Sequence, residues 1–230
     1  MFAEVIIPYI IVLLFSYLMG SFSPSYLIGR AKKVDLKKTA TRNLGASNTT
    51  LVLGWKFGAL VGVIDIAKGI LAVVLTRFLA PALPAIAFVS ATAVVLGHIF
   101  PPYLKFRGGK GFATYIGAVS GLCFPYAVLL AVVIISLALL TNYLVAGTFV
   151  TVIAAPLFFG FYTGEWYTGV ILGIASIVVI LKHRENIVRI KEGREGKVRN
   201  LFGKGYRKKV DAALEEFNSE EDEREKNRKS

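Results

Sequence analysis

Long apolar runs constrain this chain more than any other feature of its sequence. Several of them approach or reach the roughly 17–25 residues that a helix needs to cross a bilayer. The runs are Phe2–Tyr17, Gly58–Leu75, Ala82–Phe100, Tyr126–Leu140, Tyr143–Tyr162 and Thr168–Leu181. Segments such as "AVVIISLALL" are apolar on every side, whereas the strands of a membrane barrel alternate polar and apolar residues. With 55% hydrophobic residues in a chain of 230, the sequence predicts an all-α polytopic membrane protein.

Positive charge is segregated along the chain, in the first polar loop, in "LKFRGGKG" and after the last apolar run. Loops rich in Lys and Arg stay on the cytoplasmic side of a membrane. All three basic segments share that side if the N-terminus is outside and Phe112–Leu122 is a short span of its own, ended by Pro125. The pattern therefore predicts about seven transmembrane helices and a cytoplasmic C-terminus. Counting residues 112–140 as one helix would give six and place "KHRENI" on the side opposite to the other bases.

The chain changes character after its last apolar run. Residues 1–190 are predicted to form the seven-helix membrane domain, and residues 191–230 a charged cytoplasmic tail that is partly disordered. The net charge of +12 fits this topology and an attraction to anionic lipid. The basic segments lack the interleaved aromatic residues of a nucleic-acid-binding module, so we expect no nucleic-acid partner.

The stretch "FPPYLKFRGGKGFATYIG" interrupts two apolar runs with bases, glycines and adjacent prolines. Pro101 and Pro102 end the helix before it, and "RGGKG" leads into the next helix. A helix start offers unpaired N–H donors and partial positive charge, and Lys110 adds a full charge, so a phosphate is the natural ligand. The string is not a nucleotide P-loop, because Gly111 follows Lys110 where that motif has Ser or Thr.

The first polar loop, "VDLKKTATRNLGASNTT", offers donors without nearby carboxylates at its centre. Hydroxyl, amide and guanidinium groups gather there on either side of Gly45, a set that suits an anion. These residues are Thr41, Arg42, Asn43, Ser47 and Asn48.

Ionisable residues also fall within or at the ends of the apolar runs. His183 and Asn186 are three apart and share a face if the last helix continues. Asp65 and Lys68 are also three apart within a run, where charges are expensive and usually pair, and we expect a structural ion pair. His98 fits two roles equally, a hydrogen-bonded packing residue or a wall of the anion site.

These segments together resemble one family, the acyl-phosphate:glycerol-3-phosphate acyltransferases of bacterial phospholipid synthesis, the PlsY type. The resemblance covers roughly residues 17–197 and rests on "GSFSPSYLIG", "NLGASNTTLVLG", "GVIDIAKG", "LGHIFPPYLKFRGGKGFAT" and "HRENIVRIKEG", in the family's order. It implies a seven-helix enzyme of the inner (plasma) membrane with its active site at the cytoplasmic face. The enzyme would move an acyl chain from acyl phosphate to the 1-hydroxyl of glycerol 3-phosphate, giving lysophosphatidic acid and phosphate.

The resemblance also implies roles for particular residues. Its predicted catalytic residues are Thr41, Arg42, His183 and Asn186. Its predicted substrate-binding residues are Asn43, Ser47, Asn48, Gly108, Gly109, Lys110 and Gly111, with Ser21 and His98 as further candidates. No cofactor or metal is expected. The expected partners are glycerol 3-phosphate, acyl phosphate, membrane lipid and the soluble enzyme that makes acyl phosphate.

The chemistry fits these residues without a catalytic dyad, because an acyl phosphate is a mixed anhydride and already activated. Two phosphorylated substrates must be held with like charges close together, so positioning and electrostatic stabilisation are the main tasks of the protein. A phosphate oxygen can take the proton of the attacking hydroxyl, and His183 is the only side chain of suitable pKa in the last motif. Acyltransferases of the His-x4-Asp kind are excluded, since Tyr103 and Val188 stand where the carboxylate would be.

The first loop departs from the family at two points. Ala40-Thr41-Arg42-Asn43 replaces the usual Gly-Ser-Gly-Asn, and Leu51 replaces a functional arginine. The "GS-x-P" turn is also altered, to Gly20-Ser21-Phe22-Ser23-Pro24. A paralogue with another acceptor therefore stays open as an alternative, and so does a transporter or binding protein for a phosphorylated metabolite. A transporter needs a site near mid-membrane with access from both sides, whereas these motifs gather at one face, which favours the enzyme.

Overall fold

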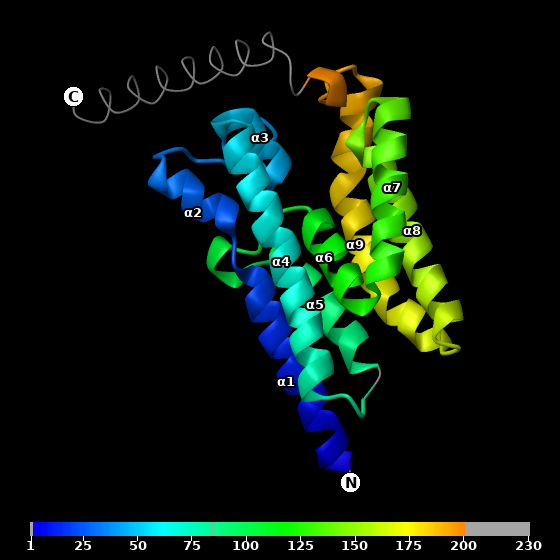
Figure 1. The fold of residues 1–230 in the computed structure, drawn as a ribbon. Coiled ribbons are helices and arrows are strands. Elements are labelled where there is room, and N and C mark those ends of the chain that lie inside the picture. The colour runs from blue at the N-terminus through cyan, green and yellow to red at the C-terminus, as the bar shows by residue number, and fades with distance from the viewer. Residues whose placement is uncertain (1, 84, 201–230) are drawn as a thin grey trace, which may run out of the picture.

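The protein is described here by a computed structural model that covers residues 2–83 and 85–200 (Figure 1). The described residues form helices joined by short connections and contain no strand. The helices are α1 (Phe2–Ser21), α2 (Pro24–Ala31), α3 (Ala46–Leu53), α4 (Trp55–Leu79), α5 (Ile86–Ile99), α6 (Phe112–Leu122), α7 (Phe124–Thr141), α8 (Leu144–Tyr162) and α9 (Trp166–Lys191), with short 3-10 helices η1 (Pro102–Leu104) and η2 (Val198–Asn200). By length and composition, 6 of the described helices can cross a membrane. The predicted all-α polytopic membrane class is confirmed.

The break between α6 and α7 falls where the sequence places it. Cys123 is extended, with φ −151°, and Pro125 stands in the first turn of α7, where its missing N–H does no harm. The chain reverses direction from α5 to α6 and again from α6 to α7, and α6 lies in the middle of the bundle (Figure 1). With 11 residues, α6 is shorter than its neighbours. The count of seven spans and their orientation stay predictions.

Close contact with α4 holds α6 in the middle of the bundle. A Cβ on Gly117 would lie 2.0 Å from the Ile66 carbonyl oxygen, and one on Gly69 would lie 2.4 Å from that of Thr114. Only glycine lets the two backbones approach so closely. Tyr115 is completely buried, and its hydroxyl hydrogen-bonds to Ser176 of α9 at 2.7 Å. The start of α6 is thereby fixed relative to α4 and α9.

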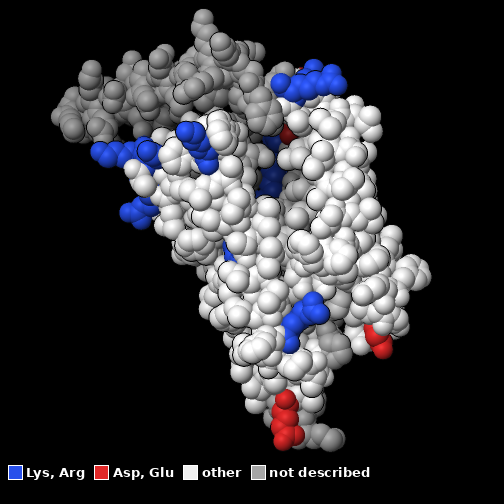
Figure 2. Space-filling view, in the orientation of Figure 1, with Lys and Arg blue, Asp and Glu red and all other residues white. Residues whose placement is uncertain are grey.

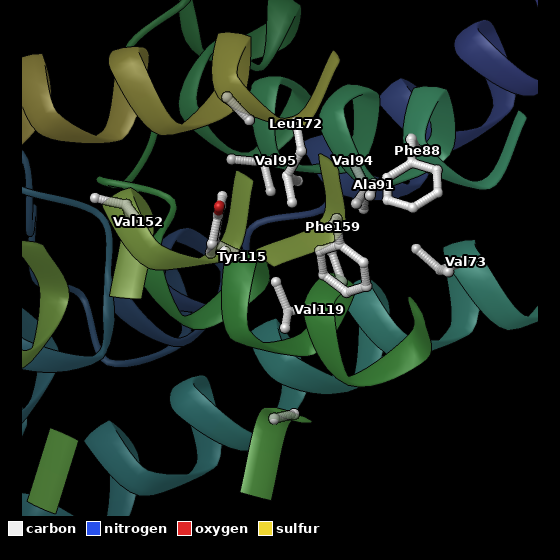
Figure 3. Packing of buried hydrophobic residues seen from close by; sticks show 14 of the residues in the cluster. Val73, Phe88, Ala91, Val94, Val95, Tyr115, Val119, Val152, Phe159 and Leu172 are labelled. Carbon is white, nitrogen blue, oxygen red and sulfur yellow. The ribbon is translucent and has the colours of Figure 1, made fainter. Parts of the chain in front are cut away.

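The main core lies between α4, α5, α6, α7, α8 and α9, and Figure 3 shows part of it. Phe88 of α5 and Phe159 of α8 meet edge to face, with ring centroids 5.3 Å apart, a favourable aromatic geometry. Val94 and Val119 fill the space between the helices and are completely buried. This rigid centre supports the loops at the end of the bundle where α2 and α3 lie.

The first polar loop contains two short helices that the sequence analysis treats only as a loop. The Ser23 hydroxyl accepts a hydrogen bond from the Tyr26 N–H at 3.3 Å, and Pro24 follows as the first helical residue. Ser at the N-cap followed by Pro is a strong start signal. A small second core beneath α2 and α3 anchors this loop, and it consists of Leu36, Leu44, Val52 and Leu104.

Charged side chains are distributed unevenly over the surface in Figure 2. Lys and Arg gather at the end where α2, α3 and the end of α9 lie, and they are sparse at the opposite end.

Single cysteines near Lys37, Arg107 and Lys191, in a Cys123→Ser background, should therefore react with a membrane-impermeant thiol reagent only from the cytoplasmic side. External labelling of the position near Lys191 alone would instead mean six spans.

Candidate active site

The glycine loop before α6 is folded back against the end of α5. Lys105 and Phe106 adopt left-handed conformations, with φ 56° and 58°, and turn the chain after η1. The Gly108 N–H then donates to the Ile99 carbonyl at 3.0 Å, and the Gly109 N–H donates to the His98 carbonyl at 3.2 Å. A Cβ on Gly108 would lie 2.1 Å from the His98 oxygen, so this turn requires glycine.

Lys110 leaves this turn directly before the start of α6. Gly111 caps the helix with φ 87°, a conformation that favours glycine. Lys110 is half-buried, and its ammonium donates a hydrogen bond to the Asn186 side-chain oxygen of α9. The positive end of α6 and a lysine charge therefore occur together, as the sequence predicts for an anion site.

A carboxylate completes this contact from beyond the end of α9. The Asn186 amide donates to one oxygen of Glu195 at 2.6 Å, and Arg189 Nε donates to the other at 2.7 Å. The pKa of Lys110 is lowered to about 8, mainly by burial and also by the nearby Arg189, while Glu185 and Glu195 partly offset both effects. Lys110 is thus less firmly protonated than an ordinary surface lysine.

His183 lies buried on the same face of α9, one turn before Asn186, because α9 continues through "KHRENI" to Lys191. Its Nδ1 lies 2.8 Å from the Val179 carbonyl oxygen. Since a carbonyl only accepts, Nδ1 carries the proton, and Nε2 of the neutral ring keeps a free lone pair. Phe112 and Phe149 approach the ring edge to face, with centroids 6.4 Å away in each case. The geometry suits a proton acceptor held in one tautomer.

Asn48 organises the first loop from within. This completely buried side chain accepts hydrogen bonds from both the N–H and the hydroxyl of Thr41 at 2.8 Å, and it donates to the Leu36 carbonyl at 2.9 Å. Thr41 is half-buried, and Asn43 beside it is also half-buried. Asn48 therefore orients the loop that carries these donors, and its direct contact with substrate stays a prediction.

Two residues flanking Thr41 adopt backbone conformations that favour glycine. Ala40 has φ 50° and Arg42 has φ 56°. These are the two positions where the resemblance places glycines, and a residue with a side chain is strained in this conformation. The Arg42 side chain is exposed and makes no hydrogen bond or ion pair with any residue that the structure describes.

The glycine turn is the point where the first loop and the last helix meet. A Cβ on Gly109 would lie 2.5 Å from the Leu44 carbonyl oxygen, so the first loop lies against the turn. Lys110, one residue later, contacts Asn186 of α9. Figure 2 shows a hollow at this end, between the part of the bundle containing α3 and α4 and the part containing α7 and α9, with basic side chains inside it.

The remaining candidates lie at or near the same end of the bundle. Ser47 is exposed on α3. Ser21 is buried; its hydroxyl donates to the Tyr17 carbonyl at 2.8 Å, and its own carbonyl accepts from the Tyr103 hydroxyl at 2.8 Å. The expected pair of Asp65 and Lys68 is present, with Lys68 Nζ 2.8 Å from Asp65 Oδ1. His98 joins this pair rather than standing alone.

Sequence reasoning missed Glu195 and Arg189 as members of the site. Arg189 stands three residues after Asn186 on a helix, so the 3.6-residue period that relates His183 to Asn186 could have identified it. Glu195 follows the end of α9 and carries no such signal, because only the return of the chain places it beside Asn186.

The side chains around Lys110 include groups of a kind that can bind an anion. Within residues 2–83 and 85–200, no group of 3 or more His, Cys, Asp or Glu side chains could hold a metal ion. A lysine, a helix start and an amide, as at Lys110, α6 and Asn186, are groups that can bind phosphate.

This fold defines an integral membrane helix bundle in which Lys110, at the start of α6, contacts Asn186 of α9. The family model for glycerol-3-phosphate acyltransferase matches residues 10–193. The chain belongs to the glycerol-3-phosphate acyltransferase family, and the prediction of a membrane acyltransferase of phospholipid synthesis is confirmed.

Named relatives agree with this assignment. A glycerol-3-phosphate acyltransferase of Bartonella henselae is 36% identical over 191 residues, covering 82% of this chain and 90% of that protein. One of Shouchella clausii is 37% identical over 205 residues, covering 84% and 97%. The crystal structure of PlsY in its glycerol 3-phosphate form superposes with a TM-score of 0.75 at 31% identity, covering 84% of this chain and 98% of that one. The lysophosphatidic acid form gives 0.72 at 30% identity.

Proposed function

We propose that this protein transfers an acyl group from acyl phosphate to the 1-hydroxyl of glycerol 3-phosphate, giving lysophosphatidic acid and inorganic phosphate. The observation that carries the proposal is Lys110, which stands at a glycine-built helix start and contacts Asn186 within a fold of this acyltransferase family. A similar chain is known in a glycerol 3-phosphate form. The 1-hydroxyl oxygen attacks the acyl carbon, and the bond from that carbon to the phosphate oxygen breaks.

The protein's contribution to this reaction is mainly electrostatic. Lys110 and the free N–H groups at the start of α6 would hold the acceptor phosphate. Thr41 and Arg42 would face the second phosphate from the first loop. The proton of the attacking hydroxyl has two available acceptors, an oxygen of the leaving phosphate and His183 Nε2. Such a cationic site can hold both substrates together against the repulsion between their phosphate groups.

The same proposal includes the location of the reaction and its partners. The basic end of the bundle would face the cytoplasm of the inner membrane, because loops rich in Lys and Arg stay on that side. Glycerol 3-phosphate would arrive from the cytoplasm, and acyl phosphate would come from a soluble enzyme that makes it. The acyl chain would remain in the bilayer beside the apolar helices.

Purified protein, acyl phosphate and a panel of glycerol phosphates test the proposal directly. Mass spectrometry should detect lysophosphatidic acid with glycerol 3-phosphate as the preferred acceptor. A different acylated product would indicate a paralogue with another acceptor. Absence of any product, together with uptake of a phosphorylated metabolite into proteoliposomes, would support the transporter instead.

The pKa of Lys110 predicts an alkaline limit to activity. With a pKa of about 8, the ammonium loses its proton as pH rises through that value, so kcat/KM for glycerol 3-phosphate should fall about tenfold per pH unit above it. The charged groups near this lysine are Arg189, Glu185 and Glu195, and His183 also lies close.

Lys110→Arg is the matched variant, because a guanidinium stays protonated throughout this range. Its kcat/KM should be lower at neutral pH but should no longer fall near pH 8. A wild-type profile without an alkaline limb near pH 8, or a limb that persists in the arginine variant, would contradict the assignment to Lys110.

A further inference from the structure

A buried ionic cluster lies beneath the glycine turn. Lys68 Nζ contacts three acceptors: Asp65 Oδ1 at 2.8 Å, His98 Nδ1 at 2.8 Å and the Phe22 carbonyl oxygen at 2.7 Å. Asp65, Lys68 and His98 are only 1%, 5% and 6% exposed. The contact with Asp65 is an ion pair, and those with Phe22 and His98 are hydrogen bonds, so these polar contacts of the lysine all lie inside the bundle.

Both members of the pair contact one nitrogen of His98. Lys68 Nζ lies 2.8 Å from Nδ1. Asp65 Oδ1 lies further from Nδ1, at 3.3 Å. Lys68 is therefore the group that orients the imidazole, and Asp65 balances its charge.

The other edge of the imidazole lies against the glycine turn. A Cβ on Gly109 would lie 2.0 Å from His98 Nε2, so the ring and the Gly109 backbone are in contact. The backbone carbonyl of the same histidine accepts the Gly109 N–H at 3.2 Å. Lys110 follows at once, so the position of its backbone depends on His98.

The cluster also joins segments that are distant in the sequence. The Phe22 carbonyl belongs to the turn between α1 and α2, Asp65 and Lys68 belong to α4, and His98 ends α5. Charges inside a membrane bundle are expensive and usually have a function. A buried ion pair is also weak evidence for stability, since apolar residues often replace one without loss.

We propose that the buried Asp65–Lys68 pair positions the glycerol 3-phosphate site by holding His98 against the glycine turn that carries the site's lysine. The proposal rests on the proposed function and extends it to three residues that need not touch substrate. The pair fixes the ring, the ring supports the turn, and the turn places Lys110 next to Asn186. This role explains why a charged pair is buried in α4 near the glycine turn. It also explains why His98 contacts that turn through both its ring and its backbone carbonyl.

The paired replacement Asp65→Leu with Lys68→Met tests this dependence, because it removes both charges and leaves apolar side chains of similar volume. We expect KM for glycerol 3-phosphate to rise on the order of tenfold or more, since a displacement of about 1 Å in a positioning element can cost about 100-fold. KM for acyl phosphate should change little. Ser90→Ala is the matched control, because it removes a buried 2.8 Å hydrogen bond between α5 and α1 away from the turn, and it should leave both KM values unchanged.

A double-mutant cycle with Lys110→Ala separates positioning from general loosening of the fold. If the Asp65–Lys68 pair acts through the turn, replacing it in the Lys110→Ala protein should lower kcat/KM little further than Lys110→Ala alone does. Independent, multiplying effects would overturn the proposal. If the paired variant does not fold, His98→Asn keeps the charged pair and an acceptor for Lys68 but removes the ring from Gly109, and it must show the same rise in KM.

The outcomes distinguish this proposal from the function on which it rests. A wild-type protein that forms no lysophosphatidic acid would overturn the proposed function. If the wild type is active but the paired variant keeps an unchanged KM for glycerol 3-phosphate, only the positioning role is overturned. The His98→Asn variant serves for this comparison if the paired variant does not fold.

Discussion

Lys110→Ala is expected to raise KM for glycerol 3-phosphate by roughly 10- to 150-fold, since a charge-assisted hydrogen bond contributes about 1.5–3 kcal/mol. The side chain stands where the glycine turn delivers it to the start of α6, and it contacts Asn186 from there. Its removal also leaves the Asn186 oxygen without its donor. Initial rates at several acceptor concentrations, with acyl phosphate saturating, measure the effect.

Arg184→Ala is the matched control for this variant. Arg184 is an exposed cation on α9, directly after His183 and outside the contact between Lys110 and Asn186. Its loss removes the same unit of charge from the same end of the bundle, so KM for glycerol 3-phosphate should change little. Full activity of Lys110→Ala with an unchanged acceptor dependence would remove the anion-site interpretation of the glycine loop.

The parts of this site that sequence could predict are those set by local chemistry. Apolar runs locate the long helices but not α2 and α3, Pro125 marks the break before α7, and "RGGKG" indicates backbone geometry that favours glycine at Gly108 and Gly111. Helical periodicity predicts that His183 and Asn186 share a face if the last helix continues, and α9 does continue to Lys191. Each of these signals acts over a few residues, so it can be recognised without knowing the fold.

The remaining parts depend on contacts between distant segments. Glu195 becomes a neighbour of Asn186 only because the chain turns back after α9. The sequence leaves two roles open for His98, a packing residue or a wall of the anion site. The choice depends on which groups contact its ring in the fold. The fold resolves this by placing Lys68 on one edge of the ring and Gly109 on the other. Such pairings follow from helix packing and have no local pattern.

Arg42→Gly is expected to make the protein more stable but at least about tenfold less active in acyl transfer. Its φ of 56° is a left-handed conformation that costs a residue with a side chain about 1–2 kcal/mol, and glycine would relieve that strain. The same substitution removes a guanidinium from the loop that presents Thr41. A charge-assisted bond to phosphate contributes about 1.5–3 kcal/mol, which sets the expected loss of activity.

The reason to expect that loss is the paired change in the first loop. A cation stands at position 42 where the resemblance places glycine, and Leu51 stands where the resemblance places an arginine. Leu51 is half-buried against the small core of Leu36, Leu44, Val52 and Leu104. We propose that Arg42 supplies the missing charge, reaching the bound phosphates from the other side of Gly45 with a planar fork of donors.

Ala40→Gly is the matched control, because Ala40 has φ 50° and carries no charge. It should raise the unfolding temperature as Arg42→Gly does and leave acyl transfer unchanged. Leu51→Arg alone should change activity little and lower stability slightly, since it removes an apolar contact. In combination with Arg42→Gly it should recover much of the lost transfer. Arg42→Gly should therefore gain stability and lose acyl transfer. Ala40→Gly and Leu51→Arg should change stability with little change in acyl transfer.

The combination of these variants separates compensation from an ordinary surface cation. A surface arginine in a strained conformation would give a gain in stability with no loss of transfer when replaced by glycine. That result would exclude compensation, because the bound anion would then be held by Lys110, Thr41 and backbone N–H groups alone. Loss of transfer without recovery by Leu51→Arg would place Arg42 in the site but reject the exchange of positions. Only loss followed by recovery shows that one cation has taken over the task of the other across Gly45.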